Sequence, residues 1–489
     1  MTAKTTLPML WLAMFGAVVQ AQTPQRPNVL FIAADDLRND LACYGHPLVK
    51  TPHLDRLAAR SVVFERAYCQ QAVCNPSRSS LMTGRRPDTL QIWSLTTHYR
   101  NPERPLVTLP QHFKANGYFT QGIGKLFHNW KTDEFSDPPS WSVPEQMHLG
   151  THGDDRPKIS GTLPPSLANH QKCECREVPD DAYYDGRIAA LAVSALKECA
   201  QKSQPFFLGV GFWKPHSPFN APKKYWDLYQ RSEIPPPSPA EWPENAPRIA
   251  WHNSREMLGN NGSAPAPAAV QEIRHGYLAN ISYLDAQIGR VLEELDRLQL
   301  TDKTIIVFWS DHGYHLGEQT LWAKTSNFEL DARVPLLVAM PAARTQRRTA
   351  ALAELLDLYP TLAELCELPR AEGVDGVSLA PVVRGESTAV RAASLTQHPR
   401  PAYFQGAPDA MGYSVRTPEF RYTEWRDWKS GETIARELYD HRASDDERRN
   451  VVDDPSFTGD AKKGAEALAG FHPLVQPGWK PVVPVVNAK

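Results

Sequence analysis

The run Asn28-Val29-Leu30-Phe31-Ile32-Ala33-Ala34, which leads directly into Asp35-Asp36, decides the fold class of this chain. The run is short, almost wholly apolar and rich in strand-forming residues, as a strand covered on both faces of a sheet requires. Comparable runs occur at residues 205–212, 304–310 and 334–340. Segments with helical periodicity separate these runs, and strands that alternate with helices predict an α/β sheet.

The longest helical pattern, at residues 268–298, places apolar side chains at spacings of three and four residues. Such a stripe marks the face of a helix that packs against a core. We therefore expect this helix to cover one face of the sheet.

Polar side chains follow three of the predicted strands, at the point where each strand ends. They are Asp35-Asp36, Lys214-Pro215-His216 and Asp311-His312. Open α/β sheets bind their ligands at the carboxyl ends of the strands. The sequence thus predicts one functional site that the three clusters share.

The chain of 489 residues is longer than one core usually supports, so we expect a main domain at 22–385 and a smaller one at 386–489. Short strand-like segments at 411–416, 420–425 and 434–439 predict a small antiparallel sheet in the second domain. The net charge of −2 argues against a nucleic-acid partner.

The N-terminus has the pattern of a signal peptide. Lys4 precedes an apolar stretch at 7–19, and small residues are placed for cleavage after Ala21. The alternative is an uncleaved anchor, but the stretch is shorter than the ~20 residues that a membrane span needs. We expect residues 1–21 to be removed, and the mature protein to be secreted or periplasmic without a membrane span.

The seven cysteines are an odd number, so in an exported protein at least one stays outside any disulfide. Cys74 is the predicted unpaired residue. Cys173 and Cys175 lack the second Cys or His pair that a zinc finger needs. Two interpretations remain for this pair, a bridge to Cys199 or two thiols.

The adjacent carboxylates of Asp35 and Asp36 repel each other unless a cation neutralises them, which favours a metal site. The alternative is a solvated turn or a helix cap. With Asp311 and His312, the set offers three carboxylates and one imidazole. This set suits Ca²⁺ or Mg²⁺, and the imidazole leaves Mn²⁺ or Zn²⁺ open.

The run Cys74-Asn75-Pro76-Ser77-Arg78 precedes a predicted short helix at 77–83. A helix N-terminus stabilises anionic groups, so this position suits an oxyanion. The alternative is a cysteine that acts as a small buried hydrophobe. The run continues through Leu81-Met82-Thr83-Gly84-Arg85, and a chance match over that length is improbable.

With these residues, the sequence resembles the formylglycine-dependent type I sulfatases, whose signature is Cys-x-Pro-Ser-Arg followed by Leu-x-Thr-Gly-Arg. Within the family, the likeness is greatest to the iduronate-2-sulfatase branch. Three segments carry it: Asp311-His312-Gly313, Trp322-Ala323-Lys324 and Met411-Gly412-Tyr413-Ser414-Val415-Arg416-Thr417.

The resemblance implies an alkaline-phosphatase-like fold, with a mixed sheet flanked by helices and a smaller C-terminal antiparallel sheet. It also implies that a maturation enzyme oxidises Cys74 to formylglycine. The implied metal is Ca²⁺, with Mg²⁺ or Mn²⁺ less suited. Its ligands by resemblance are Asp35, Asp36, Asp311, His312 and the modified Cys74.

Family roles also fall on five basic residues. Arg78 steadies the formylglycine, and Lys125 and Lys324 bind the sulfuryl oxygens. His216, with Lys324 beside it, gives a proton to the leaving oxygen, and His128 removes the proton of the second hydroxyl. A lysine or histidine of this set, taken singly, is more typical of a solvated surface or of a satisfied hydrogen-bonding residue.

The implied substrate is a sulfate ester on a sugar of a sulfated glycan, with specificity in the loops at 92–104 and 131–180. His98, Tyr99 and Arg100 are candidate contacts for a uronate carboxylate, or plain surface. Two alternative functions are a phosphodiester or phosphonate hydrolase of the same superfamily, and a non-catalytic binder of sulfated glycans.

Two further residues are weaker candidates for the site. His315 lies three residues beyond the predicted ligand His312 and is a weaker candidate for the pocket. Arg333 precedes the last predicted strand, and its alternatives are a pair with Asp331 or contact with solvent.

Overall fold

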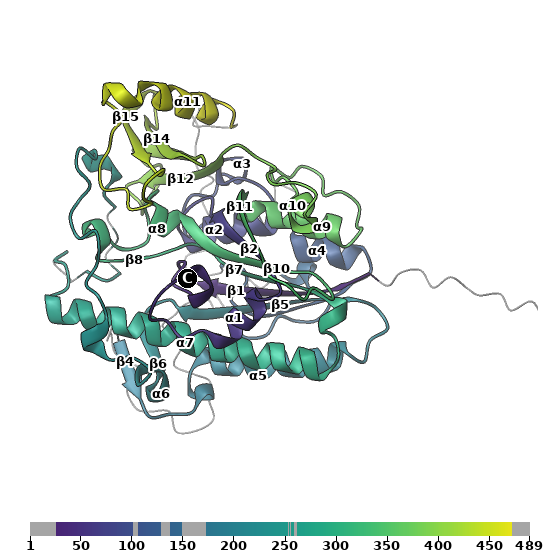
Figure 1. The fold of residues 1–489 in the computed structure, drawn as a ribbon. Coiled ribbons are helices and arrows are strands. Elements are labelled where there is room, and N and C mark those ends of the chain that lie inside the picture. Colours follow the sequence, from purple (N-terminus) through teal and green to yellow (C-terminus); the bar gives the residue numbers. More distant parts are fainter. Residues whose placement is uncertain are drawn as a thin grey trace, which may run out of the picture.

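The computed structural model describes residues 26–100, 106–128, 137–148, 173–252, 254, 256–258 and 262–471. Its centre is a seven-stranded sheet in the order β11-β2-β10-β7-β1-β5-β3 (Figure 1). The strands are β1 (Asn28–Asp35), β2 (Val62–Tyr68), β3 (Phe119–Gly124), β5 (Phe206–Pro215), β7 (Thr304–Ser310), β10 (Arg333–Ala339) and β11 (Arg347–Glu354). Strand β10 runs antiparallel to both its neighbours, and the other neighbouring strands are parallel. The predicted mixed sheet is confirmed.

Alternate residues of the strands pack against two layers of helices. Leu30 and Ile32 of β1 face one layer, and Val29 and Phe31 face the other. The first layer consists of α1 (Pro52–Ala58), α5 (Tyr184–Cys199) and α7 (Pro267–Arg297). The second consists of α2 (Cys74–Thr83), α3 (Pro87–Leu90), α4 (Leu109–Ala115), α9 (Leu358–Leu365) and α10 (Ala380–Arg384).

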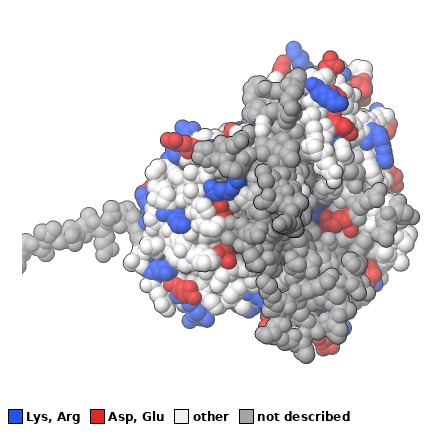
Figure 2. Space-filling view, turned by 180° about the vertical axis from the view of Figure 1, so that it is seen from behind, with Lys and Arg blue, Asp and Glu red and all other residues white. Residues whose placement is uncertain are grey.

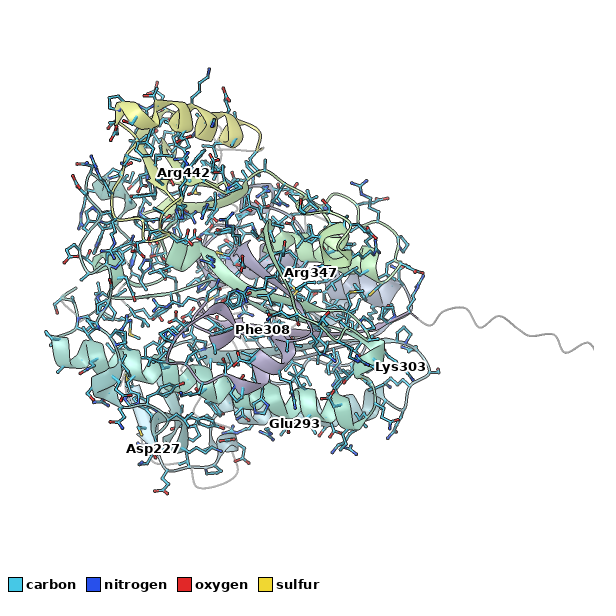
Figure 3. The ribbon with its side chains drawn as sticks, viewed as in Figure 1. Asp227, Glu293, Lys303, Phe308, Arg347 and Arg442 are labelled. Carbon is cyan, nitrogen blue, oxygen red and sulfur yellow. The ribbon has the colours of Figure 1, made fainter. Side chains whose placement is uncertain are left out.

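Helix α7 confirms the long helix predicted at 268–298. Figure 3 shows Phe308 of β7 in the interior of the molecule and Glu293 of α7 at its periphery. The shorter helices α6 (Lys223–Trp226) and α8 (Glu329–Ala332) lie in connections. The same is true of two strand pairs, β4 (Cys173–Arg176) with β6 (Phe219–Pro222) and β8 (His315–Leu316) with β9 (Trp322–Ala323).

The strand ends meet at one edge, as predicted. Strands β1, β5 and β7 are parallel, and Asp35 is in register with Pro215 while Ala34 is in register with Ser310. The residues that follow these strands therefore share one edge of the sheet.

A second sheet, wholly antiparallel, forms a lobe with α11 (Thr458–Ala469) at the top of Figure 1. Its strands are β12 (Ser394–Arg400), β13 (Ala410–Arg416), β14 (Phe420–Asp427) and β15 (Thr433–Asp440). The predicted sheet is confirmed, with β12 in addition. Hydrogen bonds join this sheet to the main one, including Leu395 N to Glu354 Oε1 at 2.6 Å. The division at residue 385 stays a prediction.

The predicted signal peptide at 1–21 lies outside the described residues. Within the described ranges, no helix has the length and apolar character to cross a bilayer. All seven cysteines are described, and no disulfide joins any of them. The odd count therefore does not single out Cys74, and of the two interpretations of Cys173 and Cys175 the structure favours thiols. On the face in Figure 2, Lys and Arg of the described residues are interspersed with Asp and Glu.

Two glycines let the end of β3 and the residue after it lie very close to the neighbouring strand β5. Gly124 has a φ of 77°, and a Cβ there would lie 2.0 Å from the carbonyl oxygen of Gly211. A Cβ on Gly211 would lie 2.1 Å from the carbonyl oxygen of Lys125. Both contacts are with backbone atoms, so a side chain at either position displaces Lys125 from the sheet edge.

Gly211→Ala is therefore expected to lower the free energy of unfolding by about 1–3 kcal/mol, the usual cost of overpacking a tight interior. Gly459→Ala is the control, because a Cβ at Gly459 of α11 meets nothing within 4 Å. Its expected change is under about 1 kcal/mol. Denaturant titration of both variants measures the difference. Equal effects would contradict the conclusion that the close approach at Gly211 excludes a side chain.

Candidate active site

Arg78 of α2 is the central cation of the sheet edge. Its guanidinium donates to Asp311 Oδ2 at 2.8 Å and to Asp35 Oδ1 at 3.3 Å. It also donates to the carbonyl oxygens of Ala34 and Leu126, at 3.1 and 3.2 Å. Although burial alone would lower the pKa of Arg78, Asp311 and Asp35 raise it above its usual range. The side chain is wholly buried, so it joins β1, β7 and α2 as a permanent cation.

Cys74 begins α2, three residues earlier than the helix start predicted from the sequence. Its Sγ lies 3.6 Å from Asp35 Oδ1 and 3.4 Å from His312 Nε2. Burial, followed by the charge of Asp35, raises the pKa of the Cys74 thiol well above its usual range. The encoded thiol is therefore neutral and a weak nucleophile.

One ligand atom from each of Asp35, Cys74, Asp311 and His312 lies within 4.8 Å of the others, and all four residues are buried. His312 Nδ1 is 2.9 Å from the carbonyl oxygen of Gly313, to which it donates as the protonated nitrogen. Its Nε2 lone pair then faces Asp311 Oδ2 at 3.7 Å. Acceptors that face one another in this way, with a backbone partner orienting the imidazole, fit a bound cation.

Asp36 completes the acidic set from the other side. Its backbone has a φ of 61°, a left-handed conformation that is uncommon for a residue other than glycine. The backbone carbonyl accepts a hydrogen bond from Tyr277 Oη at 2.7 Å, and the carboxylate lies 3.4 Å from His312 Nε2. Burial raises the pKa of Asp36 well above its usual range, against the opposite effect of Lys324.

Lys125 and His128 follow β3. The ammonium of Lys125 pairs with the Asp35 carboxylate and lies 3.7 Å from Cys74 Sγ. Burial, followed by the charge of Lys125, holds the pKa of His128 well below its usual range. The charges of Asp35, which raises this pKa, and of Arg78, which lowers it, act on His128 as well.

Lys324 and His216 form a pair on the Asp36 side. Lys324 Nζ lies 2.9 Å from Asp36 Oδ2 and 3.1 Å from His216 Nε2. His216 Nδ1 is 2.6 Å from the carbonyl oxygen of Ser217, so Nδ1 carries the proton and Nε2 accepts from Lys324. Burial and the charge of Lys324 lower the pKa of His216 to about 3.

Comparison with known proteins adds a family to this geometry. The sulfatase family profile matches residues 27–368, and a profile for the C-terminal part of N-sulphoglucosamine sulphohydrolase matches 317–470. The chain is a member of the sulfatase family. It is 36% identical to the iduronate 2-sulfatase of Mus musculus, over 83% of this chain and 86% of that protein.

Solved structures share the fold of this sulfatase at lower identity. One, determined in complex with its substrate D-glucosamine-2-N,6-O-disulfate, has a TM-score of 0.71 and 21% identity, and the match covers 91% of this chain and 97% of that one. A phosphonate monoester hydrolase from Silicibacter pomeroyi has a TM-score of 0.72 and 22% identity, with 91% and 94% covered. At these identities the likeness establishes the fold alone.

Three weaker candidates have other partners. Arg100 pairs with the Asp137 carboxylate through Nε and Nη2, at 2.7 and 2.8 Å. Tyr99 is buried and so is not part of the surface, whereas Arg100 is partly exposed and its guanidinium is paired with an internal carboxylate. The two ring nitrogens of His315 form hydrogen bonds with the side chains of Asp331 and Gln319, which gives His315 a structural role.

Arg333 also departs from both sequence interpretations. Its Nη1 lies 3.2 Å from Asp445 Oδ2 and 3.9 Å from Glu329 Oε1. The partner of Arg333 is therefore neither Asp331 nor only solvent. It is Asp445, an acidic residue that follows the C-terminal sheet.

Glu256 is a site residue that sequence reasoning missed. Its Oε2 lies 2.7 Å from Lys324 Nζ, and its Oε1 accepts from Ser217 and Tyr314. It belongs to an irregular connection before α7, where no periodicity or motif marks a functional residue. A carboxylate opposite a predicted catalytic lysine is visible only once the chain is folded.

Arg78→Met is expected to destabilise this sulfatase by about 3–5 kcal/mol, because it removes the cation that the buried carboxylates of Asp35 and Asp311 share and leaves Asp35 with Lys125 alone. Arg344→Met is the control, since Arg344 and Asp302 form an exposed pair at 2.7 Å. Its expected cost is small, because solvent screens an exposed ion pair. Chemical denaturation gives both values, and a cost for Arg78→Met as small as the control's would show that Arg78 is not the central tie.

Proposed function

We propose that this sulfatase removes sulfate from a sugar of a sulfated glycan, with a formylglycine made from Cys74 as nucleophile. The observation that carries the proposal is the position of Cys74. It lies at the start of α2, between the carboxylate of Asp35 and the imidazole of His312, with Lys125 3.7 Å from its sulfur.

Conversion of Cys74 answers a chemical need. The encoded thiol is buried and neutral, while a hydrated aldehyde supplies a hydroxyl that attacks sulfur and a second hydroxyl through which sulfate is later expelled. A separate maturation enzyme is proposed to carry out this conversion, as the resemblance to the formylglycine-dependent sulfatases implies. Arg78 then fixes the residue's surroundings by holding Asp35 and Asp311.

We propose Ca²⁺ as the metal, with Mg²⁺ or Mn²⁺ as less suited alternatives. The oxygen-rich set of Asp35, Asp36 and Asp311 matches the ligands that Ca²⁺ prefers, and His312 and the modified residue 74 complete it. When bound, a divalent cation lowers the pKa of a coordinated hydroxyl and polarises the sulfuryl group.

The charges around the site favour an anionic substrate. The carboxylates of Asp35, Asp36, Asp311 and Glu256 face three cations, which are Arg78, Lys125 and Lys324. These groups carry one net negative charge, so a divalent cation makes the centre positive. Lys125, paired with Asp35, and Lys324, paired with Asp36, then bind sulfuryl oxygens in a buried environment where charge interactions are strong.

The proton for the leaving oxygen comes from the Lys324–His216 pair. His216 is neutral at physiological pH and accepts a hydrogen bond from Lys324, so the proton of the pair rests on Lys324 Nζ. A leaving sugar hydroxyl needs that proton as the bond to sulfur breaks. His128, neutral and beside Lys125, is the base that removes the proton of the second hydroxyl.

The sugar substrate is supported by sequence likeness, since a curated relative with 36% identity is an iduronate 2-sulfatase. The fold alone does not separate this reaction from phosphonate ester hydrolysis, because a phosphonate monoester hydrolase has the same architecture. A non-catalytic glycan binder has no use for a nucleophile and a proton-donating pair. The N-terminal pattern at 1–21 supports export to the periplasm or the exterior.

A comparison of esters tests the reaction type. Purified enzyme is expected to hydrolyse 4-nitrophenyl sulfate with a kcat/KM at least about 100-fold above that for 4-nitrophenyl phenylphosphonate, a difference of about 2.7 kcal/mol in transition-state binding. Cys74→Ala is expected to abolish both activities. Dominant phosphonate hydrolysis would replace the proposed function, and binding of sulfated oligosaccharides without sulfate release would favour the non-catalytic alternative.

A further inference from the structure

Glu256 joins three segments of the active site through one carboxylate. Oε1 accepts from Ser217 Oγ at 2.7 Å and from Tyr314 Oη at 2.9 Å. Oε2 lies 2.7 Å from Lys324 Nζ. Ser217 directly follows His216, and Tyr314 lies two residues beyond His312. A single side chain therefore fixes groups that follow β5 and β7 and the turn that holds Lys324.

We propose that Glu256 is a positioning residue, which keeps the Lys324 ammonium beside His216 so that the pair delivers its proton to the leaving oxygen. This inference rests on the proposed sulfate ester hydrolysis. Glu256 acts through its neighbours and is not assigned any contact with the substrate.

Lys324 lies between two competing carboxylates. Its Nζ is 2.9 Å from Asp36 Oδ2 and 2.7 Å from Glu256 Oε2. Asp36 belongs to the proposed metal ligands, and its Oδ2 also lies 3.5 Å from His216 Nε2. Glu256 gives Lys324 a second carboxylate partner outside the proposed metal ligands, while Nζ lies 3.1 Å from His216 Nε2. Charge-assisted hydrogen bonds of this length orient a side chain strongly.

The other two contacts of Glu256 keep that carboxylate in place. The Tyr314 side chain is buried, and its ring lies under Lys324 with Nζ 5.6 Å from the centroid. Ser217 ties the turn after His216 to the same oxygen. Lys324, His216, Ser217, Tyr314 and Glu256 thus form one hydrogen-bonded network. A shift of about 1 Å in the position of a catalytic group can cost about 100-fold in rate.

The test compares two leaving groups in Glu256→Gln. Glutamine can still accept from Ser217 and Tyr314, but its amide turns a donor toward Lys324. Phenyl sulfate has a leaving group that needs protonation, since a phenol has a pKa of about 10. The nitrophenolate of 4-nitrophenyl sulfate leaves readily without a proton.

Glu256→Gln is expected to lower kcat/KM for phenyl sulfate by about 100-fold, within the range of general acid catalysis, and for 4-nitrophenyl sulfate by less than about threefold. Ser217→Ala, which removes one support, is expected to cost about tenfold on phenyl sulfate alone. Glu272→Gln is the matched control, because Glu272 is half exposed and pairs with Arg231 at 3.6 Å. It should change neither rate.

Equal losses on both esters in Glu256→Gln, or no loss, would overturn the positioning role. Circular dichroism and the unfolding temperature establish that each variant is folded. If Glu256→Gln does not fold, Ser217→Ala must show the selective loss or the inference is wrong. A wild-type enzyme that releases sulfate from neither ester contradicts the proposed function itself. An active wild-type enzyme with a Glu256→Gln variant that loses both activities equally contradicts the positioning role alone.

Discussion

The buried guanidinium of Arg78 is the interaction on which the rest of the site depends. It bonds the carboxylates at the ends of β1 and β7 and the carbonyl oxygens beside them, so the sheet edge and α2 keep one fixed relation. Without this cation, Asp35 and Asp311 would be buried charges of like sign, which a protein interior tolerates poorly. The position of Cys74, one turn before Arg78 on the same helix, follows from that tie.

Around Arg78, the two lysines of the site pair with different carboxylates. Lys125 pairs with Asp35, and Lys324 pairs with Asp36 and Glu256. The close approach of Gly124 to Gly211 brings Lys125 to the edge at the end of β3, while Lys324 directly follows β9. A sulfate group bound by both lysines meets two positive charges. Each lysine has a neutral histidine associated with it, His128 with Lys125 and His216 with Lys324.

The sequence predicted those parts of the fold whose signal is local. Strands β1, β5, β7 and β10 were predicted because they are buried on both faces and therefore nearly continuous in apolar residues. Strand β3 was not, because Gly122 and Gly124 replace side chains where Trp141 and Gly211 approach closely. Strand β2 was missed as well, since Glu65 within it pairs with Arg348 of β11 and interrupts the apolar run.

In the candidate site too, only residues with a local sequence signal were predicted. The residues predicted for it come together at one edge because they follow parallel strands or belong to a recognisable motif. Glu256 lies in an irregular connection, and its role depends on three partners distant in the chain. The partner of Arg100 was not predicted either, since nothing in the local sequence shows that Asp137 binds its guanidinium. Polar partners of this kind are set by tertiary structure and leave no periodic trace.

Mass analysis of the peptide that contains residue 74 tests the central claim most directly. In protein from its native host, the account predicts that the Cys74 thiol has been replaced by an aldehyde, with the corresponding loss of sulfur, while Cys69 in the same region remains a thiol. An unmodified Cys74 in enzyme that releases sulfate from its substrate would contradict the account.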